Sequence, residues 1–70
     1  MGYTRSQYEK AIDEVVVGEA KAKRNREILK SRLIDGDTIE EIAEKNDLST
    51  VRTYLIIKKW NEKIYQYLRN

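Results

Sequence analysis

The sequence predicts an all-α protein of three to four helices, of which the last is long. Proline is absent and glycine occurs only three times in 70 residues, so most positions hold good helix formers. Apolar residues recur at spacings of three and four, and no strand-like alternation interrupts them. Ser, Thr, Asp and Gly stand where one apolar stripe ends and the next begins, as helix caps do.

Length and composition narrow the classes of function. Seventy residues make one domain, and a chain this short buries only about 60% of its unfolded surface, so a dimer interface would add needed stability. The chain has no Cys and no His, which excludes disulfides, zinc sites and nucleophilic triads. With no glycine-rich phosphate loop either, we expect a non-enzyme without cofactor or metal. No stretch of membrane length and no signal-peptide pattern occur, so a cytoplasmic location is expected.

The first predicted helix lies within residues 1–17. Thr4 or Ser6 can cap it, and Ser6 with Glu9 has the spacing of a capping box. Four apolar residues then fall on one helix face: Tyr8, Ala11, Ile12 and Val15. Gly18 is expected to end or bend this helix.

A supporting helix is predicted over residues 20–34, where Leu29 and Leu33 continue the apolar stripe in phase. Residues 6–34 could form one helix or two. Two are favoured, because residues 18–27 offer only alanines for burial. Gly36 suits the left-handed conformation that closes a helix.

The third helix is predicted over 38–46, with Asp37 or Thr38 as its cap and two glutamates in its first turn, where negative charge favours the helix dipole. The last is predicted over 49–68, with Ser49 as its cap. At 100° per residue one continuous stripe of this helix should be buried: Thr53, Ile56, Ile57, Trp60, Ile64, Tyr67 and Leu68. Val51, Tyr54 and Leu55 cluster on the opposite side.

From Ile28 to Trp60 the chain resembles the helix-turn-helix of LuxR-type output domains and of sigma-factor region four. The resemblance rests on residues that match those families without a gap: Leu29 and Leu33 before Gly36, the EIA at 41–43 with its small Ala43, Leu48 followed by Ser49, and Ile57, Trp60 and Ile64. Asn46 and Thr53 depart from it, since those families have apolar residues there. A register with two residues deleted from the turn would instead bury Val51 and Leu55.

The resemblance implies that the last helix is a recognition helix whose outward face contacts duplex DNA. The residues expected on that face are Ser49, Thr50, Val51, Arg52, Tyr54, Leu55 and Lys58. Arg52 has the chemistry to read guanine, apolar side chains can pack on thymine methyl groups, and Tyr54 and Lys58 suit phosphates.

The charges are segregated along the chain. The net charge is −2 over residues 1–19, +5 over 20–34, −5 over 35–50 and +4 over 51–70, which sums to the total of +2. Basic residues of the second block would touch the flanking DNA backbone: Lys21, Lys23, Arg24 and Arg26. The alternative interpretation of such blocks is a set of solvated helix faces.

These features lead us to expect a sequence-specific, double-stranded DNA-binding regulator of transcription that acts as a homodimer. Its small size is typical of a phage-like regulator. The alternative is a small protein-binding factor that docks its apolar face on a larger machine, such as RNA polymerase or a phage terminase.

Overall fold

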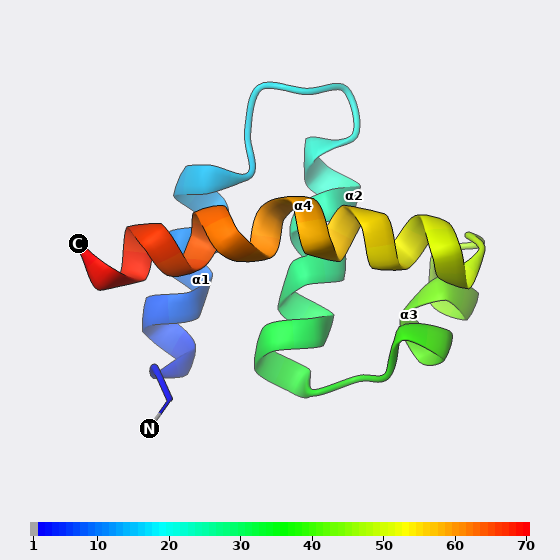
Figure 1. The fold of residues 1–70 in the computed structure, drawn as a ribbon, viewed down its shortest axis with the longest axis horizontal. Coiled ribbons are helices and arrows are strands. Elements are labelled where there is room, and N and C mark those ends of the chain that lie inside the picture. Colours follow the sequence, from blue (N-terminus) through cyan, green and yellow to red (C-terminus); the bar gives the residue numbers. More distant parts are fainter. Residues whose placement is uncertain (1) are drawn as a thin grey trace.

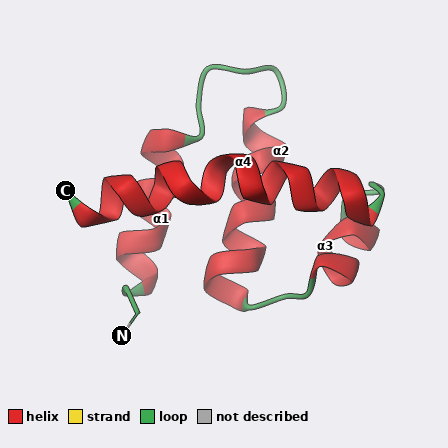
Figure 2. Cartoon of the chain, in the orientation of Figure 1, coloured by secondary structure: helices red, strands yellow, loops and turns green. Residues whose placement is uncertain are grey.

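A computed structural model describes residues 2–70 and confirms an all-α fold. Its elements are α1 (Arg5–Val15), α2 (Ala22–Lys30), the π-helical turn η1 (Ser31–Asp35), α3 (Ile39–Lys45) and α4 (Thr50–Arg69). The part of the chain that the structure describes contains no β-strand (Figure 2). It also contains no helix that is long and apolar enough to cross a membrane. The helix α4 lies across the others (Figure 1), and it packs against α1, α2 and α3.

Helix α1 begins two residues earlier than the Ser6 cap would place it. The Thr4 side chain accepts a hydrogen bond from the Gln7 backbone N–H (3.2 Å), and the Gln7 side chain accepts one from the Thr4 N–H (2.8 Å). The capping box is therefore Thr4 with Gln7, and not Ser6 with Glu9. The helix ends at Val15, two residues before the predicted boundary at 17.

The two-helix interpretation of residues 6–34 is confirmed, because a loop over residues 16–21 separates α1 from α2. Gly18 in this loop has a φ of 83°. Helix α2 starts at Ala22 and continues without interruption through η1. Gly36 then adopts the expected left-handed conformation with a φ of 75°, and its N–H donates to the carbonyl of Ser31.

Helices α3 and α4 are joined by a tight turn, and we call residues 38–69 the α3–turn–α4 unit. Thr38 caps α3 through a capping box with Glu41. At the other end, the Asn46 side-chain amide donates to the carbonyl of Ile42 (2.8 Å). The Leu48 N–H donates to the carbonyl of Ala43 (2.9 Å), which holds the turn against α3. Ser49 caps α4 by accepting from the Arg52 N–H (3.0 Å).

The buried side of α4 follows the ungapped register. Five of its residues are buried in sequence along one stripe: Thr53, Ile56, Ile57, Trp60 and Ile64. Tyr67 and Leu68 continue the stripe half-buried. The Thr53 hydroxyl donates to the carbonyl of Ser49 (2.9 Å), so this buried polar group has a partner inside its own helix.

The core beneath α4 collects the apolar faces of the other helices. Its fully buried members outside α4 are Ala11, Ile12, Val16, Ile28, Leu29 and Ile42. Burying an aliphatic side chain of this size stabilises a fold by about 1.5 to 3 kcal/mol. Because these side chains meet the α4 stripe, the packing fixes which side of α4 must face outward.

Three tyrosines join α1 to the last turns of α4. The hydroxyls of Tyr8 and Tyr65 are 2.9 Å apart and share a hydrogen bond. Tyr3 lies near both, with ring centroids 5.9 Å from Tyr8 and 6.0 Å from Tyr65. Burial, followed by the hydrogen bond to Tyr8, raises the pKa of Tyr65 to about 12.

Candidate nucleic-acid interface

The outward side of α4 is apolar and basic at its start. Val51, Tyr54 and Leu55 are 67%, 48% and 53% exposed, and they are large apolar residues that the core leaves in solvent. Arg52 and Lys58 are exposed among them, with the Lys58 ammonium 6.0 Å from the centre of the Tyr54 ring. All five residues lie where the sequence predicts them, opposite the buried stripe.

The two remaining predicted residues of this helix differ in their availability. The Ser49 hydroxyl oxygen is committed to the cap of α4, although the residue is exposed. Thr50 is not the cap of α4, and it lines a shallow groove of about 400 Å³ between the starts of α3 and α4. Val51 and Tyr54 line the same groove, together with Arg32 from η1.

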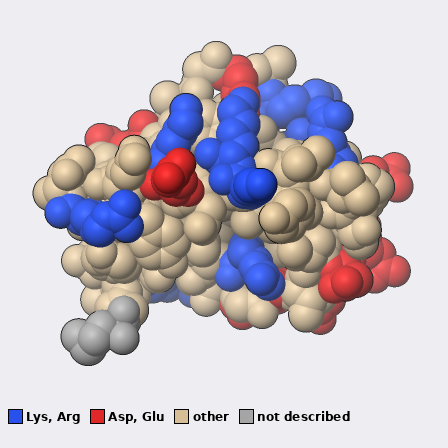
Figure 3. All heavy atoms as spheres, in the orientation of Figure 1, with Lys and Arg blue, Asp and Glu red and all other residues tan. Residues whose placement is uncertain are grey.

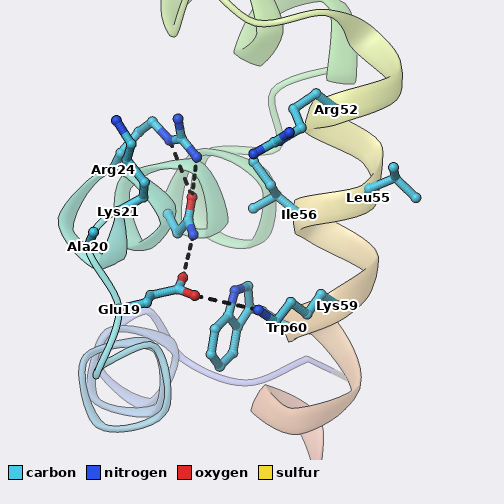
Figure 4. A pocket seen from close by; sticks show the side chains of 10 residues that line it. Glu19, Ala20, Lys21, Arg24, Arg52, Leu55, Ile56, Lys59 and Trp60 are labelled. Carbon is cyan, nitrogen blue, oxygen red and sulfur yellow. Dashed lines mark hydrogen bonds and ion pairs between the residues drawn. The ribbon is translucent and has the colours of Figure 1, made fainter.

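A second groove lies between the start of α2 and the middle of α4, and we call it the α2–α4 groove. It measures about 380 Å³ (Figure 4) and is lined by residues of both helices and of the preceding loop: Glu19, Ala20, Lys21, Arg24, Asn25, Arg52, Leu55, Ile56, Lys59 and Trp60. It brings together Lys21 and Arg24 with Arg52 and Leu55, which the sequence analysis placed in two separate groups of candidate DNA contacts.

A buried asparagine organises the polar side of this groove. Asn25 is only 5% exposed. Its Oδ1 accepts from Arg24 Nε (3.3 Å) and Nη2 (3.2 Å), and its Nδ2 donates to a carboxylate oxygen of Glu19. The other Glu19 oxygen lies 3.5 Å from the Lys59 ammonium. The chain Arg24–Asn25–Glu19–Lys59 therefore ties α2 to α4 across the groove.

Lys23 and Arg26 do not line the groove. Lys23 is exposed on α2. Arg26 is half-buried, and its guanidinium donates to the carbonyl of Val16 (2.9 Å), just beyond the end of α1. Arg26 therefore satisfies a carbonyl at a helix end, which was not foreseen, and its side chain is less available to a DNA phosphate than that of Lys23.

Charge is distributed unevenly around the α3–turn–α4 unit. On the face drawn in Figure 3, Lys and Arg atoms lie along α4 and beside the start of α2, with some acidic atoms between them over α4, and further Asp and Glu atoms gather at the edge formed by α3. Of the basic residues on α4, only Lys59 belongs to one of the four ion pairs found among residues 2–70. Arg52 and Lys58 thus keep their charge available to a partner.

Six residues that line the α2–α4 groove were not among the predicted contacts: Glu19, Ala20, Asn25, Ile56, Lys59 and Trp60. Lys59 follows Lys58 and lies on the exposed side of α4, so a helical wheel could have found it. Asn25 lies on the same stripe of α2 as Ala22, Ile28 and Leu29, so periodicity could have placed it on the buried side. Its hydrogen bond to Glu19, in contrast, depends on a loop and leaves no such signal. Trp60 was expected in the core, and it is, but one edge of its ring also borders the groove.

No family model matches this chain, and comparisons with curated proteins and with solved structures find no similar protein.

Proposed function

We infer that the protein binds duplex DNA through the outward face of α4 and regulates transcription. The observation that carries this proposal is the composition of that face: Val51, Tyr54 and Leu55 are exposed beside Arg52 and Lys58, on a helix whose other side is buried. A helix with side chains is about 10 to 12 Å wide, which matches the major groove of B-DNA.

The α3–turn–α4 unit supports the proposal by its shape. Its two helices are joined by a tight turn, as a helix-turn-helix requires, and in that motif the second helix enters the major groove and its first turns reach the base edges. Arg52, in the first turn, would donate two hydrogen bonds to a guanine, while Val51 and Leu55 would pack on thymine methyl groups. Tyr54 and Lys58, which are neighbours on this face, would contact phosphates.

The distribution of charge agrees with this orientation. The carboxylates of α3 gather at its own edge of the molecule, and the basic residues of α4 lie outside that edge. Lys21, Lys23 and Arg24 extend the basic surface from α4 to the start of α2. Phosphates would therefore meet mainly cations, and binding would weaken as salt concentration rises.

We also propose that the protein binds DNA as a homodimer, because two copies would double the base contacts at half-sites about one helical turn apart. A hollow at the end of α4 is the surface for pairing: it is lined by Gln7, Lys10, Tyr67, Leu68 and Asn70. This surface lies away from Arg52 and Leu55, so pairing there leaves the DNA face free.

Substitution of Arg52 tests the function directly. Arg52 is exposed and pairs with no carboxylate among residues 2–70, so Arg52→Ala should change the stability of the fold by no more than about 0.5 kcal/mol. If Arg52 reads a base, the variant should lose about 1 to 3 kcal/mol of binding and relax preference at one position of a selected duplex. Lys23→Ala should weaken all duplexes alike and lower the salt slope by about one unit.

A matched control is Gln66→Ala, which removes an exposed polar side chain near the far end of α4 and should leave binding unchanged. The measurement is fluorescence anisotropy of duplexes enriched from a random pool, at several salt concentrations. If neither Arg52→Ala nor Lys23→Ala alters binding, or if no duplex is enriched, the DNA proposal is wrong.

The exposed apolar trio of α4 also favours a second candidate, a protein-docking role. Val51, Tyr54 and Leu55 together would form a helix face able to enter an apolar groove of a larger protein. Such a contact should be nearly insensitive to salt, in contrast to DNA binding. Tyr54→Ala or Leu55→Ala should then abolish the protein association, and Arg52→Ala should leave DNA binding at its background level.

A further inference from the structure

The α2–α4 groove has more positive charge than its surroundings neutralise. Four cationic side chains line it, from Lys21, Arg24, Arg52 and Lys59, against the single carboxylate of Glu19. Figure 4 shows Arg24 and Arg52 extending toward each other from opposite walls. Like charges that face one another across a gap repel, and an anion between them removes the repulsion.

The one carboxylate in the groove is already engaged. Glu19 accepts from Asn25 through one oxygen and pairs with Lys59 through the other. Arg24 is held by the neutral Oδ1 of Asn25, and Arg52 belongs to none of the ion pairs found in residues 2–70. The two guanidinium groups thus retain donors that no carboxylate of the described chain satisfies.

A second, independent feature points to a missing acceptor. Trp60 is 7% exposed, and its Nε1 is the one buried side-chain polar atom in residues 2–70 without a hydrogen-bond partner. An indole N–H can only donate, so the group needs an acceptor oxygen. Figure 4 shows the nitrogen-bearing edge of the ring turned into the groove, beside Glu19 and Lys59. The contact between those two residues is long, at 3.5 Å, and an oxygen that reaches the indole N–H would have to displace it.

We propose that the α2–α4 groove is a binding site for a phosphate group. Its lining offers two guanidinium forks, two ammonium groups and the indole N–H of Trp60, which are all donors and favour an oxyanion. Guanidinium groups match the tetrahedral oxygens of phosphate in pairs, which a chloride ion cannot reproduce. The phosphate belongs either to a nucleic-acid backbone or to a small phosphorylated molecule.

The site does not depend on base reading by α4. A duplex lying on α4, with Arg52 turned to a base, would bring a backbone phosphate to the remaining donors Lys21, Arg24 and Lys59, and the groove would then fix the position of α2 on that duplex. A free phosphorylated ligand would occupy the same donors without any duplex. Competition between a duplex and inorganic phosphate distinguishes these two sources. Titration with inorganic phosphate alone tests the site independently of the proposed DNA binding.

Trp60 is the only tryptophan in the chain, so its intrinsic fluorescence reports on the groove without a label. Inorganic phosphate is titrated into the protein at pH 7 while sodium chloride keeps the ionic strength constant. A saturable change in fluorescence is expected. Arg24→Gln and Arg52→Gln should each raise the apparent Kd by at least about tenfold, because each removes a charge-assisted hydrogen-bond donor.

Lys63→Gln is the matched control. The Lys63 ammonium lies 5.4 Å from the centre of the Trp60 ring but does not line the groove, so the variant makes the same change of charge near the same chromophore. Its Kd for phosphate should stay within about twofold of the unmodified protein. Circular dichroism verifies that the variants are folded. If Arg24→Gln disturbs the fold through the lost bonds to Asn25, the Kd of Arg52→Gln decides the outcome.

A mixed-sequence duplex identifies the source of the phosphate. If the duplex changes Trp60 fluorescence and competes with inorganic phosphate, the backbone occupies the groove. If phosphate binds but the duplex does not compete, the site takes a small phosphorylated ligand and stands even where DNA binding fails. The proposal is overturned if phosphate gives no saturable signal, or if Arg24→Gln and Arg52→Gln bind it as well as Lys63→Gln does. If phosphate gives no saturable signal while a duplex binds with no response from Trp60 and no effect of Arg24→Gln, the phosphate site is overturned and the DNA function survives.

Discussion

Trp60 lies in the buried stripe of α4 and also borders the α2–α4 groove. Its ring is buried in the stripe between Ile57 and Ile64, and two ammonium groups, of Lys59 and Lys63, lie 4.9 Å and 5.4 Å from its centre. Such contacts add favourable cation–π energy to the burial of the ring. The unpartnered N–H opposes these gains, since a buried donor without an acceptor costs free energy.

This combination predicts two different outcomes for two substitutions. Trp60→Ala should lower the free energy of unfolding by about 3 to 5 kcal/mol, the range for truncating a buried aromatic residue, and could unfold a domain of this size. Trp60→Phe should cost clearly less, because it keeps a ring in the stripe and removes the unpartnered donor. Urea unfolding followed by circular dichroism measures both, and an alanine variant as stable as the original would contradict the packing of α4.

Tyr65 predicts a dependence of stability on high pH. Its pKa is raised from 10.0 to about 12 in the folded protein, so the folded state holds the phenolic proton more tightly than the unfolded state does. The contribution is complete below about pH 10 and is lost as pH rises toward 12. The midpoint of thermal unfolding should therefore fall less steeply between pH 9 and 12 in Tyr65→Phe than in the original protein. Parallel curves would show that this tyrosine does not couple folding to pH.

At the scale of elements, two glycines adopt the left-handed conformation after a helix: Gly36 caps η1, and Gly18 lies in the loop after α1. Gly18 and Gly36 both have positive φ, and a Cβ added at either would meet no atom within 4 Å. Any cost of an alanine there must come from the backbone conformation itself and not from a clash. Gly36→Ala and Gly18→Ala should each lower the free energy of unfolding by about 1 to 2 kcal/mol.

Gly2→Ala is the natural comparison, since Gly2 also has open space around it but no positive φ. It should change stability by less than about 0.5 kcal/mol. Chemical unfolding of the three variants under one condition tests whether the positive φ is the source of the cost. Equal stabilities for all three would mean that neither loop needs its left-handed residue.

The register of a long helix could be predicted from the sequence, whereas some helix caps could not. The register of α4 was predictable because a helix of 20 residues repeats its burial pattern often enough to fix the phase. Caps were predictable where one candidate stood alone, as with Ser49. At the start of α1, Ser6–Glu9 and Thr4–Gln7 have the same spacing, and local sequence cannot choose between them.

Contacts made by loop residues could not be predicted from the sequence. Arg26 bonds to the Val16 carbonyl and Asn25 to Glu19, and both depend on how residues 16–21 fold back beside α2. Neither contact leaves a periodic signal in the sequence. The candidate site was therefore foreseen on α4, where periodicity applies, and only partly foreseen on α2, where tertiary contacts decide which cations remain available.

At the scale of the whole molecule, the predicted homodimer can be tested apart from DNA. Tyr67 and Leu68 are only half-buried at the end of α4, so a second copy could cover them. Sedimentation at concentrations from low to high micromolar should show a shift from monomer toward dimer, and an operator-like duplex should strengthen it. A monomer throughout this range, with and without duplex, would contradict the pairing.

Helix α4 contacts all three other helices, which makes the domain respond as one cooperative unit. Its 20 residues form a rod about 30 Å long. Because the residues of α4 belong to the same core cluster as those of α1, α2 and α3, we expect detachment of this rod to cost nearly the same free energy as global unfolding. A ligand held by the first turns of α4 would therefore protect backbone amides as far away as α1 against hydrogen exchange. That protection would grow with the logarithm of ligand concentration, as linkage between binding and folding requires.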